Sequence, residues 1–171
     1  MNSPILFSEN QRFKQWWLWL ILLAVDALFL FGVVQQVVLG NQFGDNPMSD
    51  TGLCIVAGMM LVITLIFGFS QLQTIITEEG VFVRLMPFHF RFRRYTWDQF
   101  SNMYIREYSP ITEYGGWGLR HSISGYGKAY NMAGKQGLQL VFQNGKKLLI
   151  GTQKAEELKA VLEKRILQPD L

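Results

Sequence analysis

Three arginines lie close together in a stretch where charged and aromatic residues alternate. Arg84 follows VFV, and Arg91 and Arg93 stand in the segment FHFRFRRY. Alternate residues of a β-strand share a face, so two such strands, if paired, would gather the three guanidinium groups. Guanidinium binds phosphate through paired hydrogen bonds. The pattern fits an exposed, solvated strand face that also sets the orientation in a membrane, and its functional interpretation is a phosphate or lipid-headgroup site.

A second candidate site lies in the glycine-rich segment YGGWGLRH. It contains Tyr114, Trp117, Arg120 and His121 around three glycines. Aromatic and arginine side chains are enriched where proteins bind partners, and glycine allows close backbone approach. The segment therefore predicts a partner-binding loop. The alternative is a plug, with Trp117 folded over the end of a barrel or anchored at a membrane interface.

Residue patterns of known enzymes are missing from the sequence. It has two histidines and one cysteine, and it contains neither His-Glu-x-x-His, Gly-x-Ser-x-Gly nor Gly-x-Gly-x-x-Gly. We therefore expect a non-enzymatic protein without a metal site or another cofactor. The single cysteine excludes a disulfide within the chain. A net charge of +3 is too small to predict nucleic-acid binding.

Two long apolar segments precede both candidate sites in the sequence. Residues 16–39 hold one charged side chain, Asp26, and residues 53–72 hold none. About 20 apolar residues cross a bilayer, so both segments are predicted to span a membrane around an external loop, 40–52. Basic residues flank the pair on both sides but are absent from the loop. The positive-inside rule then predicts a multi-pass inner-membrane protein with both termini in the cytoplasm.

A carboxylate inside a membrane span is costly and suggests a function. Thr64 lies at a depth matching that of Asp26 and could share a hydrogen bond with it, and Gly32 and Gly58 could let the helices approach closely. We interpret these four residues as an intramembrane packing or assembly contact, with ion translocation as the alternative.

The residues after the second span alternate with period two. Strands are expected at 74–78, 81–86, 88–95, 101–108, 128–132, 138–142 and 147–150, with a long loop at 111–125 and a final helix capped by Thr152. Asn144-Gly145 predicts a type I′ hairpin. The expected organisation is a cytoplasmic N-terminal segment (1–15), a two-helix hairpin (16–72) and a cytoplasmic α+β domain (73–171).

Seven strands closed by one helix, with YGGWGLR at 114–120 and NGKKLLIGTQKAEEL at 144–158, resemble bacterial PH-domain membrane proteins. The resemblance implies a two-helix transmembrane hairpin followed by a PH-like domain, a seven-stranded antiparallel barrel capped by a C-terminal helix. It implies no particular ligand.

From these features we expect a non-enzymatic inner-membrane protein that presents its PH-like domain at the cytoplasmic surface. The domain would serve as a scaffold for a protein partner, a membrane complex or a second copy, with membrane lipids around the spans. One alternative is a module that responds to anionic lipid through Arg84, Arg91 and Arg93. Another is an accessory subunit of a membrane enzyme or transporter.

Overall fold

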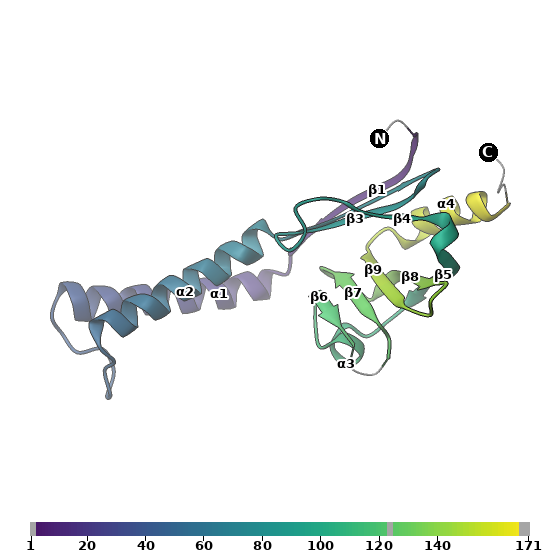
Figure 1. The fold of residues 1–171 in the computed structure, drawn as a ribbon. Coiled ribbons are helices and arrows are strands. Elements are labelled where there is room, and N and C mark those ends of the chain that lie inside the picture. Colours follow the sequence, from purple (N-terminus) through teal and green to yellow (C-terminus); the bar gives the residue numbers. More distant parts are fainter. Residues whose placement is uncertain (1–2, 123–124, 168–171) are drawn as a thin grey trace. The chain divides into compact units, whose positions relative to one another are not determined.

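The computed structural model describes residues 3–122 and 125–167 (Figure 1). The chain divides into two compact units. One contains the residues up to Phe13 together with those from Ser70 onward, and we call it the β-rich unit. The other is a helical hairpin, Lys14–Phe69.

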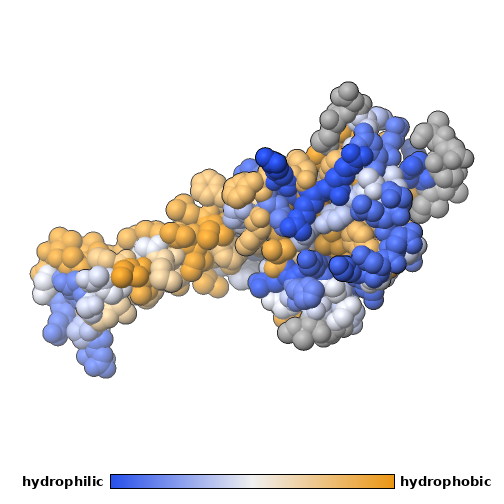
Figure 2. Space-filling model, in the orientation of Figure 1, coloured by the Kyte–Doolittle hydropathy of each residue, from blue (hydrophilic) through white to orange (hydrophobic). Residues whose placement is uncertain are grey.

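The helical hairpin is built from two apolar helices. Helix α1 covers Trp16–Val33 and continues into a π-helical turn, η1 (Val34–Val38), and α2 covers Asp50–Phe69. Both helices are long and apolar enough to span a membrane. Their apolar side chains give the helical hairpin its largely orange surface in Figure 2. The second segment, predicted to reach residue 72, ends at Phe69, because the following residues enter a β-strand.

The first sheet holds four antiparallel strands in the order β1-β2-β3-β4. They are β1 (Ile5–Arg12), β2 (Gln71–Thr77), β3 (Gly80–Met86) and β4 (Arg93–Thr96). Strand β1 comes from the N-terminal stretch that was expected to be a separate segment. The helical hairpin is thus inserted in the chain between two paired strands, and the β-rich unit is discontinuous in sequence.

Polar side chains tie β1 to the C-terminal part of the unit. The inward positions of β1 are Phe7, Glu9 and Gln11, all buried. The Glu9 carboxylate accepts hydrogen bonds from the Thr152 hydroxyl at 2.6 Å and from the backbone N–H of Gln153 at 2.8 Å. The Gln11 amide donates to the carbonyl oxygen of Gly151 at 2.7 Å. These bonds satisfy the Glu9 carboxylate and the Gln11 amide nitrogen, which would otherwise be costly to bury, whereas the Gln11 amide oxygen has no partner among the described residues.

The second sheet holds five strands in the order β5-β8-β9-β7-β6. They are β5 (Phe100–Glu107), β6 (Gly118–His121), β7 (Lys128–Asn131), β8 (Gln136–Phe142) and β9 (Lys147–Thr152). Strand β7 runs parallel to β9. The short helices η2 (Trp97–Gln99) and α3 (Pro110–Tyr114) and the final helix α4 (Ala155–Leu167) complete the unit.

The expected seven-stranded antiparallel barrel is wrong. Across residues 3–122 and 125–167 the strands form two separate sheets without closure, and one pair is parallel. Two strands that the alternation did not predict, β1 and β6, account for part of the difference. The two sheets face one core that α4 also covers. That core includes Phe7, Leu72, Val83, Tyr130, Leu140, Ile150 and Leu158.

The predicted strand 88–95 is also shorter than expected. Strand β3 ends at Met86, Pro87 has no N–H to continue a ladder, and the N–H of His89 donates to the Leu85 carbonyl at 2.7 Å. The chain therefore turns, and pairing resumes only at Arg93 in β4. We call the intervening residues, 87–92, the β3–β4 loop.

The hairpin between β8 and β9 is confirmed, but its turn differs from the prediction. Gly145 has a φ of 76°, whereas Asn144 does not have a positive φ, so the turn is not type I′. The N–H of Gly145 donates to the Phe142 carbonyl at 2.9 Å, which is the pattern of a type I turn followed by a left-handed glycine.

The final helix begins three residues later than Thr152, its predicted cap. Helix α4 starts at Ala155, and the Thr152 hydroxyl instead accepts a hydrogen bond from the N–H of Lys154 at 3.0 Å. Acidic residues occupy the first turn and basic residues the last, as predicted from the helix dipole.

A partly buried ion pair fixes α3 to β5. Arg106 donates to the Glu113 carboxylate at 2.7 Å, and the side chains are 20% and 16% exposed. Burial alone would raise the pKa of Glu113, but the hydrogen bonds from Arg106 and from the N–H of Ser109 outweigh it and lower that pKa. A lowered folded-state pKa stabilises the fold above the unfolded-state pKa, and this contribution is lost as the pH falls through the folded-state value.

We therefore expect the melting temperature of the β-rich unit to fall steeply below about pH 4, where glutamate ordinarily titrates. In Glu113→Gln the melting temperature should be lower at neutral pH and should depend less on pH in this range. Thermal unfolding of the full chain between pH 3 and 7 measures this, with the exposed Glu156→Gln as control. Parallel pH curves for the wild type and Glu113→Gln would contradict the assignment.

Candidate functional site

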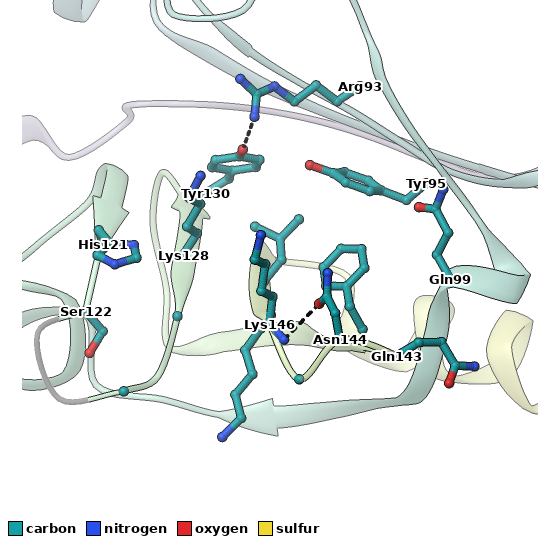
Figure 3. A pocket seen from close by; sticks show the side chains of 16 residues that line it. Arg93, Tyr95, Gln99, His121, Ser122, Lys128, Tyr130, Gln143, Asn144 and Lys146 are labelled. Carbon is teal, nitrogen blue, oxygen red and sulfur yellow. Dashed lines mark hydrogen bonds between the residues drawn. The ribbon is translucent and has the colours of Figure 1, made fainter.

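A cavity of about 730 Å³ opens in the β-rich unit. Strand β4 of the first sheet lines one side, and β7, the end of β6 and the turn between β8 and β9 line the other (Figure 3). In the view of Figure 3, Arg93 and Tyr95 lie above the cavity, and Lys146 and Asn144 lie below it. The cavity is thus assembled from segments that are distant in sequence.

Four cationic side chains line the cavity, and none of the described lining residues is acidic. The cations are Arg93, Lys128, Lys146 and Lys147. In the part of the chain that the structure describes, the ion pairs form elsewhere, at Arg94, Arg106, Lys154 and Lys159. The positive charge of the cavity is therefore not neutralised by carboxylates of the described residues, and an anion that enters meets uncompensated cations.

Aromatic and apolar groups form the rest of the wall. Tyr95 packs edge-on against Phe142, with ring centroids 5.4 Å apart, and Leu148 lies at the base of the turn. Tyr130 is buried, and Arg93 donates to its hydroxyl oxygen at 3.1 Å. Burial raises the pKa of Tyr130 to about 12, so its phenol is neutral and keeps a proton to donate.

A smaller cavity of about 240 Å³ adjoins the first and shares Arg93, His121, Lys128 and Tyr130 with it. His89 of the β3–β4 loop lines it and stacks edge-on against Tyr130 at 5.2 Å. Burial lowers the pKa of His89, and the charges of Arg93 and Lys128 lower it further. His89 is therefore neutral at pH 7, and the positive charge comes from the arginine and the lysines.

This arrangement suits an anionic ligand that also has an apolar or aromatic part. Lysine and arginine bind phosphate oxygens through charge-assisted hydrogen bonds, and the Tyr130 hydroxyl can add a neutral donor. The residues that the structure describes contain no group of three or more His, Cys, Asp or Glu side chains able to hold a metal ion. The cationic side chains and the Tyr130 hydroxyl of the cavity are the groups that could bind and orient an anion.

The predicted cluster of three arginines does not form. Arg93 lies opposite Val83 in the β3–β4 ladder, so it shares the inward face, whereas Arg84, the next residue along β3, is on the outward face. There Arg84 donates to the Gln73 amide oxygen at 3.0 Å. Arg91 is exposed in the β3–β4 loop. Only Arg93 enters the cavity, because the loop breaks the alternation that was expected to align the three residues.

The residues of the predicted partner-binding loop are divided among different surroundings. Tyr114 is buried in a small core with Tyr108, and its hydroxyl donates to the Tyr126 carbonyl at 3.2 Å. Trp117 is half-buried, and its carbonyl accepts a hydrogen bond from Arg120 at 2.8 Å. Arg120 lines the smaller cavity, and His121 lines both cavities.

The hydrogen bond and the close glycine packing expected at the intramembrane contact do not form within the helical hairpin, and a role of these residues in assembly stays a prediction. Asp26 is buried, but neither its Oδ1 atom nor the Thr64 hydroxyl has a hydrogen-bond partner within the described chain, so the two do not bond to each other. Gly32 packs against the Phe43 ring, which a Cβ atom would approach to 2.8 Å. A Cβ atom on Gly58 would meet no atom within 4 Å. The two glycines therefore do not mediate close helix packing.

Sequence reasoning missed most of the cavity. The sequence places Lys146 in a hairpin turn, Lys147 at the start of the following strand and Lys128 in a short strand, and gives no reason to bring them together. The parallel pairing of Lys128 with Leu148 does so, because it places the start of β7 beside the start of β9. A parallel pair between separated segments leaves no local pattern in the sequence.

Comparison with the models of known protein families, with curated proteins and with solved structures found no match to this chain. The resemblance to bacterial PH-domain membrane proteins therefore has no support beyond the short motifs that suggested it.

Proposed function

We propose that this protein is a membrane-spanning, non-enzymatic binding module whose β-rich unit takes a phosphate-bearing anion into the cavity between β4 and the β8–β9 turn. The observation that carries the proposal is the charge of that cavity, with four cationic side chains and no acidic one among its described lining residues. Such a cavity favours a small anionic ligand over the flat contact that a scaffold for another protein would need.

The surface of the helices supports the membrane part of the proposal. Leu20, Leu23 and Met59 are 57–60% exposed, and Phe69 is 73% exposed. In water this much apolar surface would be unfavourable on a helix pair, whereas lipid tails would cover it. The basic residues that flank the helices favour a cytoplasmic location for the β-rich unit, at the inner membrane of a bacterium.

Two sources could supply the anion. One is the headgroup of an anionic lipid in the same membrane, and the other is a soluble phosphate compound. Both would present phosphate oxygens to Arg93 and the lysines, and the apolar wall would take the attached carbon skeleton. The experiment must separate the two sources.

We would place the full-length protein in nanodiscs of neutral phosphatidylcholine and record NMR shifts of the Lys128 and Lys147 amides. One arm adds pyrophosphate as a soluble probe, and the other adds phosphatidylglycerol to the disc. We expect saturable shifts in one of the two arms. Loss of two charge-assisted hydrogen bonds should weaken binding by about tenfold or more in the double variant Lys128→Gln/Lys147→Gln.

The matched control is Lys159→Gln/Lys164→Gln, which removes the same charge from the exposed side of α4. It should bind like the wild type. Equal binding by the two double variants would show that only the net charge matters, and the cavity would be rejected as the binding site of the anion. The absence of saturable shifts in both arms would reject an anionic ligand of this class.

A further inference from the structure

The β3–β4 loop exposes two large aromatic side chains. Phe88 is 55% exposed and Phe90 is 74% exposed, and Arg91 beside them is exposed as well. Surface phenylalanines at neighbouring positions of one loop form a local apolar patch, and such patches mark contacts with other molecules or with membranes.

Contacts with the rest of the β-rich unit hold this loop in place. His89, which lies between the two phenylalanines in sequence, is buried; its backbone N–H donates to the Leu85 carbonyl, and its ring stacks against Tyr130. Arg84 lies over the Phe92 ring at 4.6 Å from its centroid. The loop is therefore attached at its middle and at its end, and the exposure of Phe88 and Phe90 follows from its folded conformation.

The strand register shows where the loop begins. Arg12, the last residue of β1, pairs with Gln71, the first residue of β2, and Gln71 pairs with Met86, the last residue of β3. Gln71 follows α2 after a single residue, Ser70, and Arg12 precedes α1 by only a few residues. Each residue extends the chain by at most about 3.6 Å, so the loop starts close to the points where the chain enters and leaves the helices.

The positive charge at this end of the sheet complements the negative charge of an anionic lipid surface. Arg12 and Arg91 are both exposed there. Anionic headgroups attract arginine near a membrane surface, and aromatic rings concentrate at the boundary between headgroups and lipid tails. The loop offers both kinds of group within a few residues.

We propose that the β3–β4 loop docks on the bilayer surface beside the helices, with Phe88 and Phe90 at the headgroup–acyl boundary and Arg91 at the headgroup phosphates. The inference rests on the proposed membrane-spanning role of α1 and α2. Docking would give the β-rich unit a second attachment to the membrane, next to the loop residue, His89, that lines the smaller cavity.

The test uses a nitroxide label on the full-length protein in nanodiscs of equal parts phosphatidylcholine and phosphatidylglycerol. The natural cysteine is removed by Cys54→Ser, and Phe90→Cys carries the label. Power saturation then compares collisions with oxygen, which partitions into lipid, and with a water-soluble nickel chelate. We expect the label at position 90 to be shielded from the chelate and to collide more with oxygen.

Two further labelled positions separate the possible failures. Ile5→Cys is the matched control, because Ile5 is also an exposed apolar residue, at 60%, but pairs with Thr77 at the opposite end of β1, about 24 Å along the strand. Met59→Cys, in α2, reports on the helices. A deep label at 59 with a label at 90 as water-accessible as at 5 would overturn the docking alone. A water-accessible label at 59 would overturn the membrane-spanning role and the docking together.

Discussion

Replacing Phe7 with alanine is expected to lower the free energy of unfolding of the β-rich unit by about 3–5 kcal/mol. Phe7 is 2% exposed and belongs to the core that the two sheets share with α4. Truncation removes a buried ring and leaves a cavity, which the strands on both sides can only partly close. Because Phe7 precedes α1 in the chain, this result would show that the N-terminal stretch is an integral part of the fold.

Hydrogen exchange of the full-length protein in nanodiscs measures this effect. Peptides from β2 and β8 should lose protection in Phe7→Ala, because both strands contribute to the same core. The control is Leu6→Ala, since Leu6 is next to Phe7 in the chain but is 38% exposed and is not part of the buried core. Similar protection in the two variants would mean that β1 is attached only loosely and that the core does not depend on it.

The sequence could not predict β1 because its buried positions are not uniformly apolar. Of the three inward residues only Phe7 is apolar, and the other two, Glu9 and Gln11, are buried because β9 and the residues after it provide hydrogen-bond partners. A hydrophobic pattern cannot reveal such positions, since the partners lie more than 130 residues away and become visible only in the fold.

The opposite error occurred in the segment FHFRFRRY. Its alternation is that of a half-buried strand, yet the residues before Arg93 form the β3–β4 loop, where Phe88 and Phe90 are exposed and His89 is buried. Alternation of residue types shows only that neighbouring side chains face in different directions. A loop that buries His89 and exposes Phe88 and Phe90 gives the same alternation without the hydrogen bonds of a paired strand. The two apolar helices, the β8–β9 hairpin and α4 were predictable because their signals are local.

The candidate site was predictable only in part for a related reason. The alternating arginines predicted a phosphate site, but Arg93 alone among the three chosen arginines lines the cavity, and the prediction included none of the lysines. The lysines come from β7, from the β8–β9 turn and from the start of β9, and a parallel pairing of β7 with β9 brings them together. Contacts between residues of separate strands depend on how the strands pack around the core, and the spacing of residues along one segment does not reveal them.

Gly127 stands where that parallel pairing begins, and Gly127→Ala is expected to damage both stability and binding. Its φ is 83°, a conformation that costs a residue with a side chain about 1–3 kcal/mol. An alanine Cβ would also lie 2.3 Å from the carbonyl oxygen of Lys147, so backbone must move. The start of β7 would separate from β9, and the spacing between Lys128 and Lys147 in the cavity would change.

Gly145→Ala separates the two contributions, because Gly145 lines the same cavity with a φ of 76° but a Cβ there would meet no atom within 4 Å. It should show the cost of the positive φ alone. Hydrogen exchange of β7 and β9 should therefore be faster in Gly127→Ala than in Gly145→Ala, and the shifts caused by whichever phosphate probe binds should weaken more in Gly127→Ala. If the two variants lost equal protection but only Gly127→Ala lost binding, the backbone contact would set the geometry of the cavity without stabilising the sheet. If both retained binding, the spacing of Lys128 and Lys147 would not matter, and recognition of the anion would have to come from Arg93 and Lys146.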